Sequence, residues 1–110
     1  YNVTDNAERV EIVTFFTGHG HSSTDENCAE FCNHQHEFTV NGNTLGLLEH
    51  PNGGTPYGCY DRVNEGVSAN QYGTCVYGRA GWCPGQDVEY NRIDITSESN
   101  KGTNEVSYRG

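Results

Sequence analysis

The sequence has 110 residues, a length that fits one domain and is too short for two. Six Lys and Arg stand against fifteen Asp and Glu, for a formal net charge of -9. This acidic balance repels phosphate backbones and anionic lipids, so it argues against nucleic-acid binding and against docking on a membrane surface. No apolar stretch approaches the roughly 20 residues of a membrane-spanning helix.

The first predicted strand covers residues 10–16. Its alternation places Val10, Ile12, Thr14 and Phe16 on one face and the intervening residues on the other. A period of two is typical of a half-buried strand, so the first four side chains are expected to face a core.

A second strand is predicted from His36 to Val40, where apolar and polar residues alternate again. It runs into Asn41 and Gly42, two residues that tolerate the positive φ of a tight hairpin turn. Residues 44–48 are therefore the expected hairpin partner.

The segment from His50 to Gly81 is rich in Gly, Asn, Pro and Tyr and has almost no periodicity. A loop of this length inside a compact domain is usually functional or cross-linked. We interpret it as a long ordered loop held by cysteines.

Two further strands are predicted at residues 88–95, with a break at Asn91 and Arg92, and at residues 104–108. No window of ten or more residues carries a helical stripe. Several short strands separated by turns predict an all-β fold, a jelly-roll β-sandwich with disulfide-stapled long loops.

Five cysteines in an acidic, Lys-poor chain indicate an oxidising compartment. We expect a secreted or extracellular protein, with the periplasm or a cell surface as further options. Because the sequence contains no methionine, we expect a mature processed form or a piece of a longer chain.

The densest group of metal-ligating residue types lies between residues 18 and 36. Its members are His19, His21, Cys28, Cys32, His34 and His36. A His-x-His pair on a strand puts both imidazoles on one face, which favours zinc or a surface copper site. The cysteine spacing matches no common zinc motif, and oxidation would remove the thiols. Hydrogen-bonded histidines without a metal or cofactor are the preferred interpretation.

Glu30 lies between Cys28 and Cys32. A disulfide over so short a loop gains little from chain entropy, so its role would be to fix geometry. A carboxylate presented rigidly suits general acid/base chemistry or the polarisation of a water. The alternative is that Glu30 is one of many surface acids.

The segment from Gly78 to Gly85 contains the single Trp of the chain, Trp82, beside Arg79 and Cys83. If both are exposed, the indole ring can stack on a pyranose and the guanidinium can bind hydroxyl groups. The alternative is a buried Trp packed on a disulfide, as in many small β-domains.

Cys59, Cys75 and Cys83 form an odd set, so at most two of them pair within the chain. The remaining thiol is either free or joined to another molecule. Separately, Asn2 begins an Asn-Val-Thr sequon and is a possible glycosylation site.

Four strings in this order resemble the second, C-terminal jelly-roll domain of the peptide-N-glycosidase F family. They are Thr17-Gly18-His19-Gly20, Cys28-Ala29-Glu30-Phe31-Cys32, Gly78-Arg79-Ala80-Gly81-Trp82-Cys83-Pro84-Gly85 and Arg92-Ile93-Asp94-Ile95. The resemblance runs from about Val10 to Ile95 and implies one jelly-roll domain over residues 1–110, incomplete or part of a longer chain or assembly.

Members of that family cleave the amide bond between asparagine and the first N-acetylglucosamine of an N-glycan, without a metal. The resemblance implies that Glu30 supports catalysis through an ordered water and that Arg79 and Trp82 contact substrate. It also pairs Cys28 with Cys32 and Cys59 with Cys83, which leaves Cys75 as the odd cysteine.

The resemblance places the family's essential aspartate in a first jelly roll, which this sequence lacks. A partner domain or another subunit is therefore expected to complete a cleft for an N-glycan or glycoprotein. Two alternatives stay open, a non-catalytic structural or adhesive subunit and a glycan-binding module. The His-x-His pairs also echo the copper monooxygenases that hydroxylate peptidylglycine, but a chain without methionine cannot supply their third ligand.

Overall fold

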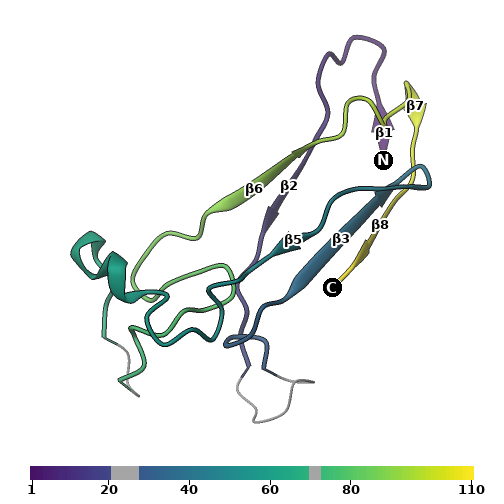
Figure 1. Ribbon diagram of the computed structural model, residues 1–110. Coiled ribbons are helices and arrows are strands. Elements are labelled where there is room, and N and C mark those ends of the chain that lie inside the picture. Colours follow the sequence, from purple (N-terminus) through teal and green to yellow (C-terminus); the bar gives the residue numbers. More distant parts are fainter. Residues whose placement is uncertain (21–27, 70–72) are drawn as a thin grey trace. The chain divides into compact units, whose positions relative to one another are not determined.

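The computed structural model describes residues 1–20, 28–69 and 73–110, and the regular structure in these ranges is almost entirely strand (Figure 1). The helical segment described is a single 3-10 helix, and none of the described helical structure is long or apolar enough to cross a membrane. The elements are β1 (Asn2–Val3), β2 (Glu11–Phe15), β3 (Gln35–Val40), β4 (Asn43–Thr44), β5 (Leu48–Glu49), η2 (Tyr60–Glu65), β6 (Tyr90–Asp94), β7 (Gly102–Thr103) and β8 (Val106–Arg109).

The strands pair over long distances in sequence. β1 pairs with β7, β2 with β6, and β8 with β3, while β4 and β5 complete the sheet around β3 (Figure 1). The pairings of β1 with β7, β3 with β4 and β3 with β8 are antiparallel. The expected all-β class is confirmed.

The chain divides into two compact units. The strand unit comprises Tyr1–Thr14, Gln35–Leu48 and Asn91–Gly110, and the loop unit comprises Phe15–His34 and Glu49–Tyr90. The first contains most of the paired strands, and the second contains most of the glycines and all five cysteines.

The predicted turn closes a β-hairpin in the strand unit. Asn41 has φ 48° and Gly42 has φ 83°, the positive values that a two-residue turn of this kind requires. Thr39 faces Thr44 across the hairpin. The amide group of Asn41 donates to the carbonyl of Glu98 at 2.7 Å, which fixes the turn against a distant segment.

The core of the strand unit gathers on one face of β3. Phe38 is 7% exposed and Val40 is fully buried, and both alternate with less buried residues as the period of two predicts. Val3 and Ile95 complete the buried apolar set.

The predicted break at Asn91 and Arg92 is wrong, because β6 runs without interruption from Tyr90 to Asp94. The other predicted strand boundaries hold to within about two residues except at two places. The hairpin partner of β3 is only Asn43–Thr44, because Gly46 interrupts residues 44–48 and pairing resumes as β5. The last strand starts at Val106 rather than Asn104. Asn104 is 5% exposed and uses its side chain to donate to the carbonyls of Asn100 and Gly102.

The loop unit is held by the two disulfides that the resemblance implies, Cys28–Cys32 and Cys59–Cys83. η2 follows Cys59 directly and lacked a sequence signal, since a six-residue 3-10 helix is too short for a helical stripe. Close backbone contacts replace regular pairing here. A Cβ at Gly78 would collide with the carbonyl oxygen of Asn52, so this site accepts only glycine without rearrangement.

Candidate functional site

The centre of the candidate site is an ion pair in the loop unit. Arg79 donates from Nε to Oε1 of Glu30 at 3.1 Å. The Arg79 side chain is fully buried, whereas the Glu30 side chain remains 19% exposed. The Glu30 carboxylate is therefore partly accessible to solvent while the buried Arg79 guanidinium holds it in place.

Arg79 is bound on several sides. Its Nη1 donates to the carbonyls of Thr74 at 2.6 Å and Tyr77 at 2.8 Å, and Nη2 donates to the Thr74 hydroxyl at 3.0 Å. With the bond to Glu30, four contacts fix the plane of the guanidinium. Sequence patterns could not reveal these acceptors, because two of them are backbone carbonyls.

The backbone around Glu30 is also fixed. The N–H of Ala80 donates to the carbonyl of Glu30 at 2.9 Å, and the carbonyl of Ala80 accepts from Gly18 at 2.9 Å. The N–H of Glu30 donates to the carbonyl of Gly20 at 3.2 Å. Three of the four strings that carry the family resemblance thus meet at one place, and the Cys28–Cys32 disulfide closes the short loop around Glu30.

Trp82 lies beside this ion pair and is partly exposed. Its indole N–H donates to the carbonyl of Gly18 at 2.8 Å. The imidazole of His19 stacks on the ring at 4.7 Å between centroids with planes 9° apart. The guanidinium carbon of Arg79 is 5.5 Å from the centroid of the same ring.

Arg79 and Trp82 are not exposed together, contrary to what the sugar-binding interpretation assumed, because Arg79 is buried; substrate contact by either residue stays a prediction. Arg79 is 3% exposed as a residue and is committed to Glu30, Thr74 and Tyr77. A ring already stacked against His19 offers less free surface than a bare indole. His19 therefore lies within the candidate site, whereas the sequence indicated it as a possible metal ligand and as part of the Thr17-Gly18-His19-Gly20 string.

The second disulfide supports the segment that carries Arg79 and Trp82. Cys59 is fully buried and Cys83 is 5% exposed. The N–H of Cys59 donates to the carbonyl of Val76 at 3.0 Å. Cys59, at the start of η2, is thus joined to Val76 before Arg79 by a hydrogen bond and to Cys83 after it by the disulfide.

The histidines of the predicted cluster are dispersed. His34 Nε2 is 3.3 Å from Cys32 Sγ in the loop unit, and His36 Nδ1 is 2.7 Å from the Tyr108 hydroxyl in the strand unit. His21 lies outside the described residues. Within residues 1–20, 28–69 and 73–110, no three His, Cys, Asp or Glu side chains gather as metal ligands.

Two further residues were singled out from the sequence, Cys75 and Asn2. Cys75 has a free, partly exposed thiol, as expected once the other two late cysteines pair. Asn2 is exposed in β1, opposite Thr103 of β7. Its glycosylation stays a prediction.

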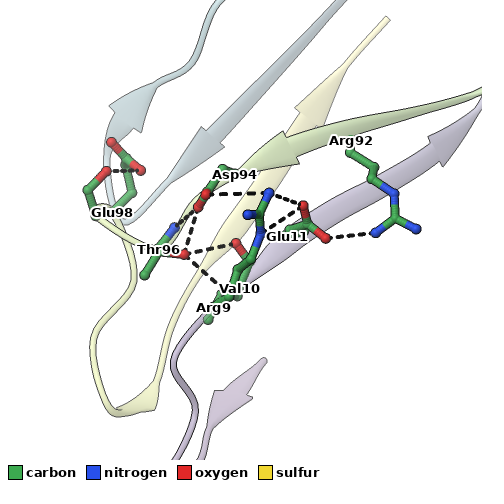
Figure 2. A network of polar contacts seen from close by, with 8 residues as sticks. Arg9, Val10, Glu11, Arg92, Asp94, Thr96 and Glu98 are labelled. Carbon is green, nitrogen blue, oxygen red and sulfur yellow. Dashed lines mark hydrogen bonds and ion pairs between the residues drawn. The ribbon is translucent and has the colours of Figure 1, made fainter.

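A second Glu–Arg cluster occupies the strand unit (Figure 2). Arg9 contacts Glu11 at 2.6 Å, and Arg92 contacts the other Glu11 oxygen at 2.9 Å. The hydrogen bond from Arg9 is the chief cause that lowers the pKa of Glu11 below its ordinary value. Both the hydroxyl and the N–H of Thr96 donate to Asp94, and these bonds lower its pKa.

One histidine of the loop unit is shifted toward its neutral form. Burial lowers the pKa of His50, and the charge of His34 lowers it further. The His50 ring packs edge-on against Phe16 at 5.6 Å between centroids.

Comparison with known proteins matches the family model described as peptide-N-glycosidase F, C terminal, over residues 1–109. A crystal structure of a peptide-N(4)-(N-acetyl-beta-D-glucosaminyl) asparagine amidase shares 22% identity at a TM-score of 0.68, and a recombinant peptide:N-glycanase F shares 23% at 0.70. Each likeness covers 99% of this chain and 35% of the other, so the chain spans about a third of those proteins. The search of curated proteins gave no match.

The likeness to both solved structures confirms the predicted jelly-roll fold. The family match covers nearly the whole chain and includes the Glu30 and Arg79 segments. The chain belongs to the peptide-N-glycosidase F C-terminal domain family.

Proposed function

We propose that this chain supplies one wall of a glycan-binding cleft in an amidase that hydrolyses the Asn–GlcNAc bond of N-glycoproteins. The observation that carries the proposal is the Glu30 carboxylate, partly exposed and held by the buried Arg79 within a fixed backbone frame. The amidase named in the similar structure acts on this class of bond, and its chain is about three times as long. A partner domain is therefore part of the proposal.

Glu30 has the catalytic role in this scheme. Arg79 binds Oε1, and we assign Oε2 to holding and polarising a water at the amide or the first sugar. A carboxylate acts well in this role when its direction is set before substrate arrives. The partner domain supplies the aspartate that the family resemblance requires.

Arg79 and Trp82 shape the cleft wall beside Glu30. We assign Arg79 first to positioning Glu30, because its guanidinium is already bound to Thr74 and Tyr77 as well. The accessible part of Trp82, together with the stacked His19, is the surface proposed to contact sugar. Two disulfides and the family relationship support an extracellular location.

The test is the change Glu30→Gln in the complete protein, assayed by release of glycan from a denatured N-glycoprotein. This change keeps the shape of the side chain and removes its charge. We expect activity to fall by at least about a hundredfold, the usual scale for losing a positioned acid or base. Full activity in Glu30→Gln would contradict the proposal.

The matched control is Glu11→Gln. Glu11 is also bound by arginine, and its side chain is 17% exposed, close to the 19% of Glu30. Because Glu11 lies in the strand unit, outside the candidate site, we expect full activity in this variant. Circular dichroism and the unfolding temperature of both variants separate lost chemistry from lost folding.

Glycan binding without hydrolysis is the second candidate, favoured by the His19–Trp82 stack. It predicts that the chain alone binds N-glycans on an array and that Trp82→Ala removes the signal. It also predicts that Glu30→Gln keeps glycan binding and that no arrangement with a partner domain cleaves the amide.

A further inference from the structure

The two disulfides of the loop unit differ in their accessibility to small molecules. Cys28 and Cys32 are both half-buried. Cys59 is fully buried and Cys83 is 5% exposed. A thiolate exchanges with a disulfide only where it reaches one of the two sulfur atoms. The Cys28–Cys32 bond is therefore the one that a thiol in solution can attack while the protein stays folded.

The two disulfides also differ in the length of chain that they close. Cys28 and Cys32 are 4 positions apart, whereas Cys59 and Cys83 are 24 positions apart. A cross-link over a short loop restricts the unfolded chain less than one over a long loop, so breaking it destabilises the fold less. We therefore expect the loop unit to stay folded when only Cys28–Cys32 is opened.

An imidazole lies beside one sulfur of the short loop. Nε2 of His34 is 3.3 Å from Sγ of Cys32. A disulfide sulfur has no hydrogen to give, so Nε2 carries the hydrogen and donates it to the sulfur. When the disulfide breaks, this N–H stabilises a thiolate on Cys32 and makes it the better leaving group. Sγ of Cys59 lies instead 3.7 Å from the carbonyl oxygen of Trp82, whose partial negative charge disfavours a thiolate.

We propose that Cys28–Cys32 is a reversible thiolation site for small monothiols of the glutathione class. The incoming thiolate attacks Sγ of Cys28 and forms a mixed disulfide, while the old S–S bond breaks and its electron pair leaves on Cys32. A second small thiolate attacks its own kind in the mixed disulfide, forms the disulfide of the small thiol and releases Cys28 as a thiolate. Two small thiols thus supply the two electrons and the two protons that the cysteines take up.

Glu30 lies inside the loop that this reaction opens. Two backbone hydrogen bonds stay in place, from the N–H of Phe31 to the carbonyl of Cys28 at 2.6 Å and from the N–H of Glu30 to the carbonyl of Gly20 at 3.2 Å. Neither bond is covalent, so the backbone of Glu30 gains mobility once the disulfide is open. Small thiols therefore loosen the carboxylate of the amidase site, a consequence that rests on the proposed function.

The first test exposes the complete protein, carrying Cys75→Ser, to reduced glutathione at about pH 8, near the ordinary pKa of a thiol. N-ethylmaleimide traps the free thiols, and peptide mass mapping locates them. We expect Cys28–Cys32 to react at least about a hundredfold faster than Cys59–Cys83, because the buried pair reacts only after local unfolding. The trapped intermediate should carry glutathione on Cys28 and maleimide on Cys32. Equal rates at the two disulfides, or glutathione mainly on Cys32, overturn the proposal.

A histidine variant tests the direction of attack. His34→Leu removes the N–H beside Cys32, so the reaction at Cys28–Cys32 should slow at least about threefold. Glutathione should then be found on both cysteines of the short loop. The rate at Cys59–Cys83 in the same protein is the internal control and should not change. Equal slowing or equal acceleration at both disulfides would mean that His34 acts on folding, which contradicts the assigned role; His34→Gln, which keeps an N–H donor, should react faster than His34→Leu.

Amide hydrogen exchange tests the effect on Glu30. After reduction of Cys28–Cys32 alone, exchange should accelerate at least about tenfold at the N–H of Glu30 and at the N–H of Ala80, which donates to the Glu30 carbonyl. The N–H of Cys59, which donates to Val76, should exchange as before. Unchanged exchange at Glu30, or an equal rise at Cys59, contradicts a local opening. None of these measurements uses a substrate, so their failure is distinguishable from failure of the proposed amidase function.

Discussion

The chain has two Glu–Arg clusters, one around Glu30 and one around Glu11. The two glutamates are similarly exposed, but the arginines that bind them differ greatly in exposure. The side chains of Glu30 and Glu11 are 19% and 17% exposed. Arg79, which holds Glu30, is fully buried, whereas Arg9 and Arg92, which hold Glu11, are 65% and 54% exposed. Figure 2 shows the second cluster, with Glu11 on β2, Arg92 and Asp94 on β6, and Arg9 just before β2.

This difference in arginine burial means that the Glu30 cluster fixes the position of its carboxylate, whereas the Glu11 cluster is an exposed set of ion pairs. A buried guanidinium must have protein acceptors for its N–H groups, so Thr74 and Tyr77 are as necessary to Arg79 as Glu30 is. Arg9 and Arg92 can exchange Glu11 for water at little cost. Only the Glu30 carboxylate is therefore fixed in direction by structure that cannot easily rearrange.

Removing the arginine should distinguish the two clusters most strongly. Arg79→Ala leaves Glu30 and two carbonyls without their buried donor, and we expect the free energy of unfolding to fall by about 3–5 kcal/mol. Arg92→Ala should have a several-fold smaller effect, because its ion pair is exposed. Urea denaturation of both variants measures this. Equal losses in the two variants would show that burial does not distinguish the clusters.

The next largest effect concerns the backbone that frames Arg79. Gly78 precedes it directly, and a Cβ there would collide with the carbonyl of Asn52 and lie 3.1 Å from Thr55 Oγ1. We expect Gly78→Ala to lower the free energy of unfolding by about 1–3 kcal/mol, the usual cost of overpacking. Gly46→Ala is the control, since no described atom lies within 4 Å of its Cβ position. If Gly78→Ala were as stable as Gly46→Ala, the backbone around Gly78 and Asn52 could move to accept the extra Cβ.

The sequence predicted the strands better than it predicted the site. Alternation located β2, β3 and β6 to within two residues, because apolar and polar side chains alternate along a half-buried strand. The Asn41-Gly42 turn was readable for the same local reason. β1 and β7 were missed, since two-residue strands are too short to show a period.

The site depended on contacts that no local pattern encodes. Glu30, Arg79 and Trp82 stood out through their neighbouring cysteines and glycines and through the family resemblance. The pairing of Arg79 with Glu30 joins residues 49 positions apart, and the stacking of His19 on Trp82 joins residues that are farther apart still. The sequence therefore indicated the candidate residues, but only the structure showed that Arg79 is buried and binds Glu30 instead of facing solvent.

Both units should lose stability in acid, but in different pH ranges, through a histidine in the loop unit and a carboxylate in the strand unit. Burial lowers the folded-state pKa of His50 below the ordinary 6.5, so the unfolded chain binds this proton more readily. The resulting stability is complete above about pH 6.5 and is lost as the pH falls through that value toward the lowered pKa. Unfolding in urea from about pH 8 to about pH 5.5 should show this loss, and His50→Gln should reduce it. A slope that His50→Gln leaves unchanged would contradict this expectation.

The smallest expected effect is at Glu11, whose lowered pKa acts in a more acidic range. Its contribution to stability is present above the ordinary pKa of about 4.5 and is lost as the pH falls through the lowered value. Because the hydrogen bond from Arg9 is the first cause of this shift, Arg9→Gln should raise the Glu11 pKa, as measured by carboxyl NMR titration. Arg92→Gln should raise it less, since the bond from Arg92 contributes less. Equal shifts of the Glu11 pKa in the two variants would mean that Arg9 and Arg92 replace each other freely as partners of Glu11. The buried Arg79 does not allow such an exchange at Glu30.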